Sequence, residues 1–118
     1  MRITLAVAAA FLTPVSALAG PYDGTYRPNA EWAKDWDCSI VGADGGALAI
    51  RNNTFFGLET ECALTNPVSV RDMNATLYDA ECSGEGETWT QRMLFALSPE
   101  GVSVVYGDGT VSELVRCP

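Results

Sequence analysis

The residues of this chain that could do acid-base chemistry are carboxylates placed two positions apart. Such pairs include Glu59/Glu61, Asp79/Glu81 and Glu85/Glu87. Residues two apart in a β-strand lie on the same face, and paired carboxylates can act as acid and base when burial raises the pKa of one member. Two of the pairs fall on the polar face of alternating segments, and the third falls in a turn. We therefore expect solvated surface charges and no catalytic pair.

Other common catalytic arrangements need residues that the sequence lacks or isolates. It has no histidine, which excludes Ser-His-Asp and Cys-His arrangements. Lys34 is the only lysine, so a Ser-Lys pair would depend on one residue of a predicted surface helix. The segment GADGGA at 42–47 lacks the lysine and the following helix of a phosphate-binding loop. We predict that the protein is not an enzyme and uses no cofactor.

Metal binding has weak support in the sequence. Carboxylate oxygens at Glu85, Glu87 and Asp108 would suit calcium. The residues around them lack the D-x-D-x-D-G spacing of a calcium loop, and the cysteines are too widely spaced for a usual zinc pattern. We predict no metal site.

The four cysteines predict two structural disulfides. They are Cys38, Cys62, Cys82 and Cys117. A small exported domain can bury only a limited core, and an even number of cysteines commonly forms disulfides that stabilise it. Four cysteines allow three pairings. Cys62 and Cys82 fall on the inward faces of strands that we expect to be neighbours, so we favour a bond between them. Cys38 and Cys117 would then join the N-terminal segment to the last strand.

Residues 1–19 have the pattern of a secretory signal peptide. Arg2 is followed by an apolar run over 3–12 and by the small-residue cleavage motif A-L-A at 17–19. The apolar run is too short for a permanent membrane span. Residues 20–118 suit a single domain. We predict a monomeric protein without a membrane span that is periplasmic or secreted.

The predicted mature chain is strongly acidic. Removal of the signal peptide takes away Arg2 and leaves six basic and fifteen acidic side chains, a net charge of −9. Such a surface argues against nucleic acid and anionic lipid as partners, because both attract Lys and Arg. It permits a cationic protein or a cell-envelope component as partner, but we expect its main effect to be keeping a small exported protein soluble.

Only residues 30–36 are predicted to be helical. Asn29 would cap this short helix, and Glu31 lies in its first turn. Trp32 and Trp36 are four apart and would share one face. We expect that face to pack on the domain, with ligand stacking as the alternative.

Downstream of Cys38 the apolar residues alternate with a period of two, which predicts strands. The expected strands lie at 48–50, 56–64, 78–82, 89–97, 102–106 and 111–117. Between them, turns or breaks are expected at 51–53, 65–67, 83–87, 98–101 and 107–109. On the inward faces we expect Phe56, Leu58, Cys62, Leu64, Tyr78, Ala80, Cys82, Trp89, Met93, Phe95 and Leu97.

This strand pattern indicates the fold class. Six to seven short antiparallel strands with regular turns are typical of an all-β barrel or sandwich. We favour a small antiparallel barrel with one short N-terminal helix, because closure removes exposed edges.

Three resemblances support this fold. The GTY at 24–26 and Arg116 are similar to calycin barrels, which often begin with G-x-W and carry a late arginine that packs over it. The pattern C…C…C-x-G-E-G-E-x-W…R-C, carried by Cys38, Cys62, CSGEGETW at 82–89 and VRCP at 115–118, resembles small exported proteins of alphaproteobacteria. More loosely, the chain resembles small periplasmic barrels that inhibit lysozymes. These resemblances imply a periplasmic, disulfide-tied β fold and carry over no functional residue.

The function expected from these features is that of a non-enzymatic periplasmic binding or inhibitor-type protein, in a specific version lysozyme-inhibitor-like. The candidate binding surface consists of Trp32, Trp36, Glu85, Glu87 and Trp89. One alternative is a calycin-like carrier that holds a small ligand with Tyr78, Trp89 and Phe95. Another is a structural protein of the cell envelope without catalytic activity. An enzyme would need a buried carboxylate with a perturbed pKa.

Overall fold

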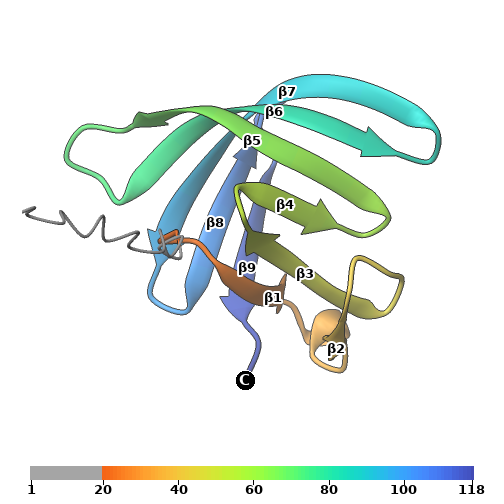
Figure 1. Ribbon diagram of the computed structural model, residues 1–118. Coiled ribbons are helices and arrows are strands. Elements are labelled where there is room, and N and C mark those ends of the chain that lie inside the picture. The colour runs from red at the N-terminus through yellow and green to blue at the C-terminus, as the bar shows by residue number, and fades with distance from the viewer. Residues whose placement is uncertain (1–19) are drawn as a thin grey trace, which may run out of the picture.

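The computed structural model describes residues 20–118 and shows an all-β domain over this range (Figure 1). The predicted signal peptide, 1–19, lies outside the described residues. The strands are β1 (Gly24–Pro28), β2 (Asp37–Val41), β3 (Gly46–Arg51), β4 (Thr54–Gly57), β5 (Thr60–Ser69), β6 (Ala75–Gly84), β7 (Glu87–Ser98), β8 (Gly101–Tyr106) and β9 (Val111–Arg116). A short 3-10 helix, η1 (Glu31–Ala33), lies between β1 and β2.

Eight of the nine strands in the described part of the chain form a closed antiparallel barrel. From β3 to β9 each strand pairs with the next along the chain, and β9 pairs with β1. Residues 24–26 of β1 pair with residues 48–50 of β3, which closes the ring. β2 lies outside the ring and runs parallel to β3. The predicted barrel is confirmed, whereas the number of strands was too low and the parallel β2 was not expected.

The predicted strand at 56–64 is two strands. A turn at Leu58 and Glu59 separates β4 from β5, and Glu59 has a left-handed φ of 54°. This turn changes which side chains face inward on β4. Phe55 is buried in place of the predicted Phe56. Leu58, in the turn, is partly buried and packs against the core, and the predicted burial of Leu64 on β5 is confirmed.

The predicted break at 65–67 is wrong, because β5 continues through Pro67 to Ser69. The register against β6 shifts between Thr65 and Val68, and Asn66 adopts a left-handed φ of 51°. A bulge interrupts the ladder locally and tolerates a proline, which has no N–H to donate. The strand therefore passes this proline without ending.

The predicted helix at 30–36 is reduced to the three residues of η1. The preceding Ala30 makes no side-chain cap, and the backbone N–H of Asn29 donates instead to the carbonyl of Glu113 at 2.9 Å. A segment this short cannot sustain an α-helix, because nucleation costs more than the few hydrogen bonds return. The two tryptophans still meet, with ring centroids of Trp32 and Trp36 5.5 Å apart.

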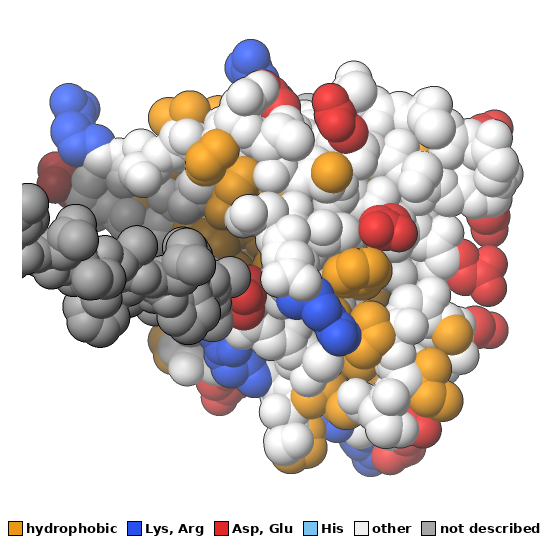
Figure 2. Space-filling model, viewed as in Figure 1, with side chains coloured by type: hydrophobic (Ala, Val, Ile, Leu, Met, Phe, Trp, Pro, Cys, Tyr) orange, Lys and Arg blue, Asp and Glu red, His pale blue; other side chains and the backbone are white. Residues whose placement is uncertain are grey.

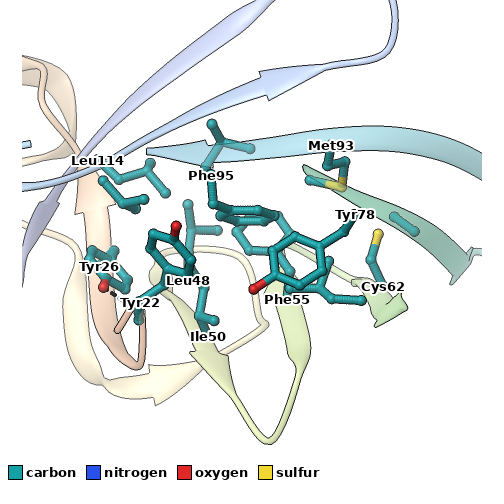
Figure 3. Packing of buried hydrophobic residues seen from close by; sticks show 14 of the residues in the cluster. Tyr22, Tyr26, Leu48, Ile50, Phe55, Cys62, Tyr78, Met93, Phe95 and Leu114 are labelled. Atoms are coloured by element: carbon teal, nitrogen blue, oxygen red, sulfur yellow. Dashed lines mark hydrogen bonds between the residues drawn. The ribbon is translucent and has the colours of Figure 1, made fainter. Parts of the chain in front are cut away.

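Side chains fill the barrel interior (Figure 3). Its aromatic centre is Phe95, which is fully buried and contacts three other rings. The centroid distances are 5.9 Å to Tyr22, 5.8 Å to Phe55 and 5.6 Å to Tyr78. Around them pack Tyr26, Leu48, Ile50, Cys62, Leu64, Ala80, Cys82, Met93, Val102, Val104 and Leu114. Each fully buried large apolar side chain contributes about 1.5–3 kcal/mol, so this cluster is the main source of stability.

The two disulfides have the favoured pairing. Cys62 and Cys82 are directly opposite each other on β5 and β6, and Cys38 of β2 bonds Cys117 after β9. The bonds close sequence separations of 20 and 79 residues. On a loop-entropy scale these contribute about 3 and about 4.5 kcal/mol to stability. Two disulfides are consistent with an oxidising compartment.

The contact between Arg116 and Tyr26 expected from the sequence is present. The guanidinium carbon of Arg116 lies 5.2 Å from the centre of the Tyr26 ring, and Nη1 donates to the carbonyl of Asp23 at 3.0 Å. Burial raises the pKa of Tyr26, and Arg116 acts in the opposite direction. The contact joins the first and last barrel strands, which supports closure of the ring.

Candidate functional site

Five exposed glutamates gather where the β4–β5 turn meets the β6–β7 hairpin, and we call this set the acidic rim. Its members are Glu59, Glu61, Glu81, Glu85 and Glu87. Strand register divides them between two faces of this end: Glu61 is opposite Ser83 and Glu81 is opposite Thr90 in outward-facing rows, whereas Glu87 is opposite Gly84 in the inward-facing row of Cys82 and Trp89. Figure 2 shows acidic side chains along the right-hand edge of the molecule, on the side where Figure 1 places these two elements.

The hairpin tip of the rim is a tight two-residue turn. Glu85 and Gly86 have φ values of 50° and 79°, the left-handed pair of a type I′ turn. The turn is shorter than the predicted 83–87, because the strands continue to Gly84 and resume at Glu87. The tip therefore holds its glutamates on a rigid, fully paired ladder.

Trp89 gives the rim a large aromatic side chain. It is opposite Cys82 across the hairpin and so belongs to the inward-facing row, as predicted. Cys82 is 3% exposed, whereas Trp89 is 37% exposed. The reason is that this end of the hairpin extends past the buried cluster, to which Cys82 belongs and Trp89 does not.

Two open grooves lie on the rim and share Ser83. The first, of about 320 Å³, is lined by Gly42, Phe56, Glu59, Thr60, Glu61, Ser83 and Gly84. The second, of about 510 Å³, is lined by Glu81, Cys82, Ser83, Thr88, Trp89 and Thr90. The first groove is lined by two glutamates and the second by one, and both have hydroxyl-bearing residues, which is a suitable lining for a basic side chain.

The basic side chains of residues 20–118 form no ion pair with the glutamates of the acidic rim. Across residues 20–118 two ion pairs form, Lys34–Glu31 at 2.7 Å and Arg92–Asp79 at 3.4 Å, and neither involves a rim glutamate. Arg51 lies over the ring of Phe56 at 5.6 Å, close to the first groove. No ion pair within residues 20–118 therefore neutralises a rim glutamate, and Arg51 is a cation beside the first groove.

The structure divides the five predicted binding residues between two places. Glu85, Glu87 and Trp89 lie on the rim. Trp32 and Trp36 lie on and just after η1, where Trp32 is 71% exposed and Trp36 packs against the core. Trp36 therefore has the expected packing role, and Trp32 borders a separate cavity.

Sequence reasoning did not include Glu59, Glu61 and Glu81 in the binding surface. They were assigned to the polar faces of separate strands, which the register confirms for Glu61 and Glu81, and the pairing of β5 with β6 brings them to the same end of the barrel as the β6–β7 turn. The signal that could have found them was the favoured Cys62–Cys82 bond, because it fixes that register.

The interior holds tyrosine hydroxyls among its packed rings. The Tyr22 hydroxyl lies 2.8 Å from the Thr76 hydroxyl, and the Tyr26 hydroxyl donates to the carbonyl of Tyr22. Burial raises the pKa of Tyr78, and the neighbouring Tyr22 raises it further. Of the three residues predicted for a carrier site, Tyr78 and Phe95 pack on each other and Trp89 lies outside the cluster.

Residues 20–118 contain no arrangement of side chains suited to acid-base catalysis or to metal binding. No charged side chain there is buried, and no cluster of three or more His, Cys, Asp or Glu residues could hold a metal ion. The suggested calcium ligands are divided, since Glu85 and Glu87 lie at the hairpin tip and Asp108 lies in the β8–β9 turn. There the carboxylate of Asp108 accepts from the Thr110 N–H and hydroxyl, which lower its pKa.

Comparison with known proteins adds no relative: no family model, no curated protein and no solved structure matches the chain. In residues 20–118, no helix has the length and apolar character needed to cross a membrane.

Proposed function

We propose that this protein is a non-enzymatic periplasmic binding protein that holds a cationic protein partner against its acidic rim. The observation that carries the proposal is the contrast at the β6–β7 hairpin. Its inner residues are packed in the core, while five glutamates and a partly exposed tryptophan gather at its end. The barrel thus has an outer surface suited to binding and an interior already filled.

Electrostatics favours a basic partner over a small apolar ligand. Carboxylates on adjacent strands raise the local concentration of cations and accelerate encounter with a positively charged protein. Trp89 supplies the aromatic surface on which a lysine or arginine can stack. In contrast, a calycin-like carrier would need free volume where Phe95, Tyr78 and Phe55 make ring contacts.

A lysozyme is the specific cationic partner that we propose. A binding protein with an acidic rim would meet the basic enzyme in the periplasm and reduce its access to the cell wall. The test is a turbidity assay in which purified protein is added to lysozymes of several types. We expect slower lysis with at least one type, and unchanged lysis with every type would overturn the lysozyme version.

Matched variants connect any inhibition to the rim. The rim variant carries Glu61→Gln, Glu81→Gln and Glu87→Gln. The distal variant carries Asp35→Asn, Asp72→Asn and Glu100→Gln, which are equally exposed and change the net charge equally. We expect inhibition to weaken by about 3- to 100-fold in the rim variant, because each of the three exposed charge pairs is worth about 0.2–1 kcal/mol. Equal loss in both variants would indicate a net-charge effect and contradict a rim site.

A further inference from the structure

The two disulfides differ in their access to solvent. Cys62 and Cys82 are 4% and 3% exposed and belong to the buried cluster. Cys38 and Cys117 are both partly exposed. Thiol-disulfide exchange requires a thiolate to reach a disulfide sulfur, so a dissolved reductant can approach the Cys38–Cys117 bond far more readily.

The Cys38–Cys117 bond holds a segment that the barrel does not need for closure. We call residues 30–41, which contain η1 and β2, the η1–β2 segment. Its strand β2 is registered against β3 at only two positions, with an irregularity between them. The ring closes between β1 and β3 without it. The segment is also open to solvent, with Trp32 71% and Ile40 48% exposed.

The same segment covers apolar surface of the barrel. Ala33 is fully buried, and Trp36 packs against the core. Trp32 forms part of the wall of a cavity of about 280 Å³ that also reaches the inward-facing Leu48 and Leu114. In Figure 1, η1 and β2 lie together at the lower side of the barrel, away from the β6–β7 hairpin. Release of the segment would uncover this apolar surface.

We propose that the Cys38–Cys117 disulfide is a reducible latch that holds the η1–β2 segment over the barrel mouth, while Cys62–Cys82 is a permanent staple. A dithiol reductant opens the latch in two steps. Its thiolate attacks one sulfur, forming a mixed disulfide and releasing the other as a thiolate. The second thiol of the reductant then displaces the first cysteine. Two electrons and two protons pass to Cys38 and Cys117, and the reductant becomes a disulfide.

The first test is native reduction followed by trapping of free thiols. The wild-type protein is treated with dithiothreitol without denaturant, alkylated at intervals, and analysed by peptide mass spectrometry. We expect Cys38 and Cys117 to be alkylated at least tenfold faster than Cys62 and Cys82. Equal rates, or faster labelling of Cys62 and Cys82, would overturn the latch.

The second test asks whether reduction releases the segment alone. Hydrogen exchange of the half-reduced protein is expected to speed up at least tenfold over residues 30–41 and to stay within twofold over β5 to β8. Unchanged exchange at 30–41 would show that the disulfide is not what holds the segment. Accelerated exchange throughout the barrel would show global unfolding and would also contradict the proposal.

Two sets of variants make the release visible by other means. In a Trp32→Phe/Trp89→Phe background, Trp36 is the remaining tryptophan, and reduction is expected to shift its emission to the red. A Cys38→Ser/Cys117→Ser variant is expected to show the shifted emission without reductant, and a Cys62→Ala/Cys82→Ala variant is expected to keep the unshifted one. The opposite assignment of the two double variants would refute the latch.

Discussion

The interior around Phe95 and the acidic rim are built from the same two strands but are suited to different tasks. In the middle of the β6–β7 hairpin, Tyr78 and Met93 are opposite each other and buried. Toward its tip, the opposite pair is Cys82 and Trp89, of which only the cysteine is buried. A few residues of extra strand length therefore separate a packed core from a solvated surface.

This difference indicates that stability and binding can be changed separately. Packed apolar side chains contribute through burial and dispersion, which ionic strength hardly alters. Exposed carboxylates contribute little to stability and act through a field that salt screens. Substitutions in the interior should change unfolding, and substitutions in the rim should change binding.

The largest effect is expected from emptying the aromatic centre. Phe95→Ala removes the ring that contacts Tyr22, Phe55 and Tyr78, and should lower the free energy of unfolding by about 3–5 kcal/mol. Urea denaturation followed by circular dichroism measures this. Leu97→Ala, on the same strand but 39% exposed, is the control and should cost clearly less. Similar losses in the two variants would mean that the interior is not the stabilising core.

A smaller effect, on binding, is expected from truncating the rim tryptophan. Trp89→Ala should weaken binding of a cationic partner by about 30-fold, equivalent to about 2 kcal/mol. Its free energy of unfolding should change by less than that of Phe95→Ala, because Trp89 lies outside the core cluster. Calorimetric titration gives the affinity. If Trp89→Ala lowered the free energy of unfolding strongly and left the affinity unchanged, Trp89 would belong to the core and not to the binding surface.

The smallest effect is a dependence of stability on alkaline pH. Burial raises the pKa of Tyr26 and Tyr78 above the ordinary value of 10.0. The folded chain therefore keeps these protons to higher pH than the unfolded chain does. This contribution is fully present below pH 10 and is lost as pH rises through the folded-state values.

Urea denaturation between pH 8 and 11 measures this dependence. The free energy of unfolding should be nearly constant up to about pH 9 and should fall above pH 10, with a slope of at most one proton per tyrosine. Tyr78→Phe removes one titrating group and should reduce the slope. An unchanged slope in that variant would exclude Tyr78 as a source of the dependence.

Much of the fold was predictable because apolar and polar residues that alternate with a period of two indicate which side chains of a strand face the core. The inward positions of Tyr78, Met93 and Phe95 followed from it, and so did the Cys62–Cys82 bond. The split of 56–64 was not predictable from alternation. Its two-residue turn uses Leu58 and Glu59, which are not typical turn residues, and apolar residues continue on both sides.

The short elements near the N-terminus depend on contacts that no local pattern reveals. Asn29 was predicted to cap a helix, but its backbone N–H donates a hydrogen bond to the carbonyl of Glu113, which is far away in the sequence. Likewise, Glu85, Glu87 and Trp89 were found by their proximity in the sequence, whereas the rest of the rim depends on strand register. Local reasoning finds the residues of one hairpin and misses those that neighbouring strands bring to it.

The most direct test of the rim as the binding surface is a nuclear magnetic resonance titration of isotopically labelled protein with a basic lysozyme. We expect amide shift changes concentrated at residues 59–61 and 81–90, weakened in the rim variant, retained in the distal variant, and reduced at high salt. Changes centred on interior residues such as Phe95 and Tyr78, or equal responses of the two variants, would contradict binding at the acidic rim.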